Sequence, residues 1–88
     1  MKLVRERKSD EKTGLKIVAT DCSYYNAYDY VVCVSQLHHF RFFDEKKVGN
    51  MTKLICTAGI TYLFDADREM LLVEEKWGRK NECSIYVE

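Results

Sequence analysis

The chain has 88 residues, with fourteen basic and fourteen acidic side chains and an apolar fraction of 47%. This length allows one small domain, and the apolar fraction excludes an intrinsically disordered chain. Because the charges cancel, no strong overall field attracts the protein to nucleic acid or to an anionic membrane. We therefore expect residues 1–88 to form a single globular domain.

The charges are distributed unevenly along the chain. Residues 1 to 16 hold six basic and three acidic side chains, whereas residues 53 to 88 hold five and seven. A basic segment at residues 1–8 therefore precedes a more acidic body. We expect this segment to form a basic edge strand or arm.

The opening of the chain carries no predicted targeting signal. MKLVRERK returns to charged residues within four positions, so it lacks the apolar segment of a signal peptide. No apolar run approaches the roughly 18 residues that span a bilayer. The protein is expected in the cytoplasm, or in the host cytoplasm if it is viral, with no membrane partner. In that compartment Cys22, Cys33, Cys56 and Cys83 are expected as thiols.

The first half of the chain is predicted to begin with a hairpin. Residues 2 to 8 and 15 to 21 flank the polar segment SDEKTG, which ends in Gly14. The second of these runs places Leu15, Ile17 and Ala19 at alternate positions, which is typical of a half-buried strand. YDYVVCV follows and is rich in β-branched and aromatic residues, so it is predicted as a central strand.

The second half of the chain is predicted as strands separated by turns. KLICT, GITYLFD and EMLLVEEKW are divided by turns at residues 58 to 59 and 65 to 68, and ECSIYVE has a clear period of two. Residues 36 to 52 fit either a further strand over residues 37 to 43 or one short helix ending before Gly49. The fold class is therefore mainly β, either all-β or β-rich α+β. We predict a small antiparallel meander or barrel of six to eight strands, with at most one or two short helices.

No motif in the chain commits to a catalytic, metal or cofactor site. The cysteines are 11, 23 and 27 residues apart, which does not fit the paired ligands of structural zinc. Asp65, Asp67 and Glu69 match the first positions of a calcium loop, but Met70 stands where that loop needs glycine. A hairpin turn in solvent is the better interpretation. A Cys22 nucleophile lacks any glycine-rich elbow or oxyanion loop, so we expect neither an enzyme nor a cofactor.

Tyrosines gather in SYYNAYDY, where four of the seven residues from 24 to 30 are tyrosine. Tyr28 and Tyr30 alternate at the start of the predicted strand, and Tyr24, Tyr25 and Asn26 precede it in a loop. Such a loop has the composition of a protein-binding paratope, although two or three of these rings could instead close the core. We expect Tyr28 or Tyr30 to be packed inside and Tyr24 and Tyr25 to be exposed. The predicted partner-binding residues are Tyr24, Tyr25, Asn26 and Tyr28.

The leading functional hypothesis is a non-enzymatic protein-binding domain. It would act as an inhibitor or regulator by occluding another macromolecule, as a monomer or a homodimer. Small inhibitors of this kind include those that phages and mobile elements direct at host enzymes or defence systems, a link made by association only.

The alternative hypothesis is a single-stranded RNA-binding or DNA-binding β domain. On a strand, HHFRFF would place aromatic rings on one face beside an arginine, where bases can stack, and the N-terminal arm would contact phosphates. The zero net charge and the missing RRM signature count against this alternative. Its predicted residues are Arg5, Arg7, Lys8, His38, Phe40, Arg41 and Phe42.

Overall fold

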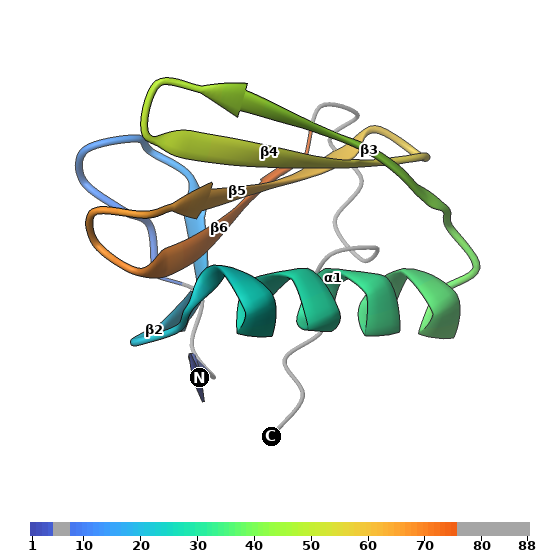
Figure 1. The fold of residues 1–88 in the computed structure, drawn as a ribbon, viewed down its shortest axis with the longest axis horizontal. Coiled ribbons are helices and arrows are strands. Elements are labelled where there is room, and N and C mark those ends of the chain that lie inside the picture. Colours follow the sequence, from blue (N-terminus) through green and yellow to red (C-terminus); the bar gives the residue numbers. More distant parts are fainter. Residues whose placement is uncertain (5–7, 76–88) are drawn as a thin grey trace.

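The structure is a computed structural model that describes residues 1–4 and 8–75. Within them, six antiparallel strands form one sheet in the order β1-β2-β6-β5-β4-β3, and a helix, α1, lies across one face of it (Figure 1). The elements are β1 (Lys2–Leu3), β2 (Lys16–Thr20), α1 (Tyr24–Leu37), β3 (Phe42–Val48), β4 (Met51–Cys56), β5 (Ile60–Asp65) and β6 (Met70–Glu75). The predicted mainly β fold is confirmed, and β3 to β6 form an antiparallel meander.

Tight turns connect the strands of the meander. Gly49, with φ of 64°, is the first residue of the two-residue turn between β3 and β4, a position that favours glycine. Ala58 and Gly59, with φ of 65° and 73°, lie in the turn between β4 and β5, where the sequence predicts one. The turn between β5 and β6 covers residues 66 to 69, one residue from its predicted position.

The predicted N-terminal hairpin is present in the described residues. β1 pairs with β2, and the Asp10 amide donates a hydrogen bond of 2.7 Å to the Leu15 carbonyl across the connecting loop. The simple alternation predicted for residues 15 to 21 is wrong, because Val18 and Ala19 are both buried. The register against β6 shifts between Ile17 and Ala19, and this irregularity changes which side chains face the core.

An arginine holds the loop at residues 9 to 14 against the β5–β6 turn. The Arg68 guanidinium donates to both carboxylate oxygens of Asp10, at 2.7 and 3.0 Å, and to Asp65 at 2.9 Å. Hydrogen bonds from Arg68 and Thr13 hold the pKa of Asp10 well below its usual range. Burial would raise the pKa of Asp65, but its hydrogen bonds with Arg68 and backbone amides outweigh burial and lower it. Both carboxylates are therefore ionised and paired.

The predicted central strand YDYVVCV is wrong, because these residues form the middle of α1. The Ser23 hydroxyl accepts a hydrogen bond of 3.3 Å from the Asn26 amide and caps the start of the helix. Apolar residues then recur at intervals of three and four, which places them on one helical face. This periodicity outweighs the β preference of single tyrosines and valines. The buried apolar residues of α1 are Ala27, Tyr30, Val31 and Val34.

Of the two predicted alternatives for residues 36 to 52, the further strand is present but covers residues 42 to 48 rather than 37 to 43, and the short helix is wrong. α1 ends at Leu37, the chain reverses at His39 with φ of 60°, and β3 begins only at Phe42. The strand therefore starts later than predicted and continues to Val48, where the short turn at Gly49 permits pairing with β4. In β3, residues 42 to 48 form backbone hydrogen bonds with β4, whereas a helix of this length would leave most of its terminal N–H and C=O groups without an internal partner.

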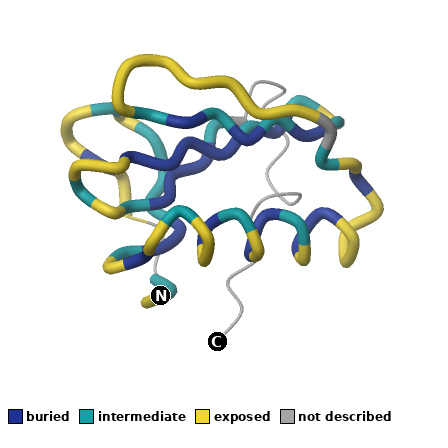
Figure 2. The backbone as a smooth tube through the Cα atoms, in the orientation of Figure 1, coloured by how far each residue is buried: buried dark blue, intermediate teal, exposed yellow. Residues whose placement is uncertain are grey.

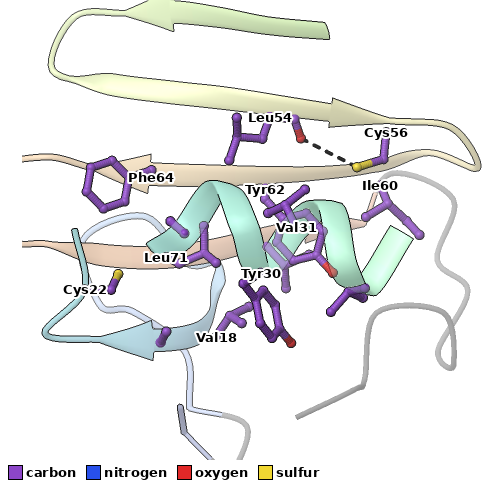
Figure 3. Packing of buried hydrophobic residues seen from close by; sticks show 14 of the residues in the cluster. Val18, Cys22, Tyr30, Val31, Leu54, Cys56, Ile60, Tyr62, Phe64 and Leu71 are labelled. Atoms are coloured by element: carbon purple, nitrogen blue, oxygen red, sulfur yellow. Dashed lines mark hydrogen bonds between the residues drawn. The ribbon is translucent and has the colours of Figure 1, made fainter. Parts of the chain in front are cut away.

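The hydrophobic core lies between α1 and the sheet (Figure 3). Val31 is fully buried, and the Tyr30 ring meets the Tyr62 ring edge-on with centroids 6.3 Å apart. The expectation that Tyr28 or Tyr30 packs inside is confirmed for Tyr30, which is 7% exposed. Strand residues that share this core include Leu54, Tyr62, Phe64, Leu71 and Val73.

Candidate functional site

Aromatic rings line the flank of α1 that faces β3. The Tyr24 ring meets Phe64 edge-on with centroids 5.9 Å apart, and Tyr28 meets Phe42 in the same way at 5.1 Å. The Tyr24 hydroxyl also donates a hydrogen bond to the Glu45 carboxylate of β3. Burial and this contact raise the pKa of Tyr24 to about 12. Tyr24 and Tyr28 are half-buried, so they attach α1 to β3 while part of each ring reaches the surface.

Tyr25 projects from the first turn of α1 into solvent. It is 78% exposed, more than any other large apolar side chain in the described part of the chain. Its ring lies edge-on to Tyr24 with centroids 5.9 Å apart, which restricts its orientation. Asn26 beside it is also exposed. The predicted exposure is thus confirmed for Tyr25 and only in part for Tyr24, and both lie on a helix rather than in a loop.

The side of α1 that faces away from the sheet is exposed (Figure 2), and it carries almost no charge. We call its six exposed residues the outer face. Asp29 is the one ionised side chain among them, and α1 contains no lysine or arginine. Solvent-facing helix surfaces usually carry many charged residues, whereas the cores of protein interfaces are depleted in charge and enriched in tyrosine. The outer face consists of Tyr25, Asn26, Asp29, Cys33, Gln36 and Leu37.

A cavity of about 430 Å³ opens beside the outer face, between α1 and the start of the chain at β1. Its walls are mainly apolar, and the polar side chains among its lining residues are those of Asn26, Asp29, Tyr30 and Cys33. Cavities of this size can receive a ligand or a large side chain. The lining residues include Met1, Leu3, Asn26, Asp29, Tyr30 and Cys33. Three of them, on α1, also belong to the outer face.

The stretch HHFRFF does not form one face of a strand. His38 caps the end of α1, His39 lies in the following turn, and both are exposed. Phe40 is 7% exposed and belongs to the core, while Arg41 is exposed and Phe42 is half-buried. The predicted row of stacking rings is therefore wrong, because the Phe40 ring lies inside the domain.

Several sequence predictions fall outside the described residues. These are the Arg5 and Arg7 contacts of the basic arm, the Cys83 thiol and the ECSIYVE strand. Lys8, the third predicted residue of the arm, is described and exposed.

The other candidate reactive groups are the cysteines and the acidic residues of the turn between β5 and β6. Cys22, Cys33 and Cys56 are free thiols, and burial raises the pKa of Cys22 and raises that of Cys56 to about 12. Cys33 is exposed. No group of three or more potential metal ligands occurs in residues 1–4 and 8–75. In the calcium-like turn, the Asp65 carboxylate accepts a hydrogen bond of 3.1 Å from the Asp67 amide and forms an ion pair with Arg68. These contacts stabilise the turn itself.

The chain matches no protein-family model, no curated protein and no solved structure. Among the described residues, no helix has the length and apolar character needed to cross a bilayer.

Sequence reasoning missed four residues of the outer face because it placed them on a strand or in an ambiguous segment. A helical interpretation groups them, since Asp29 and Cys33 are four residues apart and Gln36 follows three residues later. The signal that could have found them is the Ser23 cap, followed by apolar residues at helical spacing. The missed residues are Asp29, Cys33, Gln36 and Leu37.

Proposed function

We propose that the protein is a protein-binding domain that covers a partner's surface with the outer face of α1. The observation that carries this proposal is the composition of that face, with Tyr25 78% exposed and Asp29 as its one ionised side chain. Tyrosine is enriched at binding hot spots because it offers a large contact area and a hydroxyl while immobilising few torsions. A partner surface covered in this way is closed to other ligands, which is how such a domain would inhibit or regulate.

The attachment of α1 to the sheet supports this role. Its inner face is buried in the core, and the Tyr24 contact with Glu45 holds its first turn against β3. A helix fixed along two sides loses little conformational freedom when a partner binds. A preorganised surface of this kind therefore retains more of its contact energy as affinity.

Site-specific photo-crosslinking tests the location of the surface. A photoreactive residue at position 25 is compared with one at position 48, since Val48 is 54% exposed on β3. In a lysate of the native cell, position 25 should capture one protein that position 48 does not, with and without nuclease. Equal capture from both positions contradicts the proposal. Loss of capture after nuclease supports the single-stranded nucleic-acid alternative instead.

Affinity measurements with the captured partner test the contribution of Tyr25. Tyr25→Ala should weaken binding by roughly 2 kcal/mol, about thirtyfold in Kd, if the ring is a hot spot. The melting temperature should change little because the ring is mostly exposed. Val48→Ala is the matched control and should bind as the unmodified protein does. Wild-type affinity for Tyr25→Ala would overturn the assignment of the outer face.

A further inference from the structure

The cavity beside the outer face combines apolar walls with one carboxylate. We propose that it receives an arginine side chain from the partner that docks on the outer face. This inference rests on the proposed function, because the cavity shares Asn26, Asp29 and Cys33 with that face.

The apolar walls fit the stem of an arginine. Leu3 lies on the β1 side and Val34 on the α1 side, and Met1 extends the apolar lining. An arginine has three methylene groups that pack on apolar surface while its charged end remains beside polar groups. A volume of about 430 Å³ accommodates one such long side chain.

Asp29 supplies the charge that selects a cation. Its carboxylate makes no hydrogen bond or ion pair with any described residue, including the α-amino group of Met1. Carboxylate and guanidinium groups form paired, charge-assisted hydrogen bonds. Tyr30 also lines the cavity and adds ring surface to its apolar wall.

Other occupants fit these walls less well. A purely apolar side chain would cover the Asp29 carboxylate and the Asn26 amide without giving either a partner, which costs binding free energy. A lysine would supply a charge but not the planar fork that pairs with a carboxylate. The arginine is therefore the occupant that satisfies both the polar and the apolar walls.

A titration with two matched probes tests the proposal without any partner. The ¹⁵N-labelled full chain is titrated with Nα-acetyl-arginine amide and with its citrulline counterpart, a neutral molecule of nearly the same shape. The arginine probe should shift the amide resonances of Leu3, Asn26 and Cys33 and bind about tenfold more tightly than the citrulline probe. Equal affinities, or no shifts at these residues at any soluble concentration, would overturn the proposal.

Two variants separate charge from shape. Asp29→Asn keeps the shape of the side chain, so it should reduce arginine affinity to the citrulline level and leave citrulline binding unchanged. Cys33→Trp should fill the cavity and weaken both probes. Both positions are exposed, and the spectra of the variants report whether the fold is retained. A preference for arginine that persists in Asp29→Asn contradicts the assigned role of the carboxylate.

The probe experiment can fail separately from the proposed function. If Tyr25→Ala loses the partner but the two probes bind alike, the arginine site is wrong and the docking face stands. If the probes are discriminated but Tyr25→Ala binds the partner normally, the cavity recognises guanidinium groups and the docking face is wrong.

Discussion

The outer face of α1 and the strand β3 are both exposed, yet they differ in charge. One of the six residues of the outer face is ionised, whereas four of the five exposed residues from 44 to 48 of β3 are charged. β3 is an edge strand with no neighbour on its outer side among the described strands, so it could pair with another chain. Charged side chains along such an edge discourage that pairing.

A helix has no unpaired backbone edge, because its hydrogen bonds are internal. The outer face of α1 therefore needs no charges to prevent strand addition, and its composition can follow the needs of side-chain contacts. Figure 2 shows both surfaces as exposed, although one is rich in charge and the other is not. Exposure alone therefore does not distinguish the two surfaces, whereas the kind of exposed side chain does.

The largest expected effect tests which residues of α1 face outward. Val31→Asp should unfold the domain, because an unpaired carboxylate in the core costs several kcal/mol, comparable to the whole stability of a small domain. Cys33→Asp should leave the fold intact, since Cys33 is exposed. On a strand the two positions would share a face, so equal thermal denaturation of the variants would contradict the helix.

The sequence predicted some elements of the fold correctly and others not. The strands β4, β5 and β6 were predictable because their apolar runs are separated by turns, such as the one at Ala58 and Gly59. α1 was not, because the composition of YDYVVCV favours a strand and its length is compatible with either element. The local signals for a helix were the Ser23 cap and the apolar residues at helical spacing, and the strand-like composition hid them.

The candidate surface was predictable only in part, for the same reason. Tyr25 and Asn26 are exposed under either interpretation, so composition alone located them. Cys33 and Gln36 join them only on a helix, since they follow Tyr25 at intervals compatible with one helical side. The cavity was beyond sequence reasoning, because it pairs Leu3 with residues more than twenty positions away.

The second prediction removes the charges of β3. Asp44→Val combined with Lys46→Val leaves the net charge unchanged but replaces two of the four charged residues of the edge with apolar ones. Each cross-strand pair of valines should add roughly 0.5 kcal/mol, so an antiparallel dimer, in which the four valines form two such pairs, gains about 1 kcal/mol, about fivefold in association constant. Sedimentation velocity over a range of concentrations measures this. The control is Glu11→Val with Lys12→Val in the exposed loop, and equal association of both pairs would contradict edge protection.

The third prediction concerns the hydrogen bond between Tyr24 of α1 and Glu45 of β3. Tyr24→Phe removes the hydrogen bond to Glu45 and should cost about 1 kcal/mol of unfolding free energy at neutral pH. The pKa of Tyr24 is raised from 10.0 to about 12, so the stability from its neutral hydroxyl is complete below pH 10. That stability is lost as the pH rises from 10 to about 12. Chemical denaturation across this range should show a smaller alkaline loss for Tyr24→Phe, and identical profiles would contradict the contact.

The smallest expected effect on stability comes from adding one charge to each surface. Gln36→Lys and Val48→Lys both alter exposed residues, so each should change the unfolding free energy by no more than about 0.5 kcal/mol. Their effects on partner binding should differ. A lysine at position 36 would be desolvated in the contact without a partner charge and should weaken binding about tenfold, whereas one at position 48 should leave Kd unchanged. Equal changes in Kd for the two variants would mean that net charge, rather than contact with α1, determines affinity, because both variants alter the long-range field by the same amount.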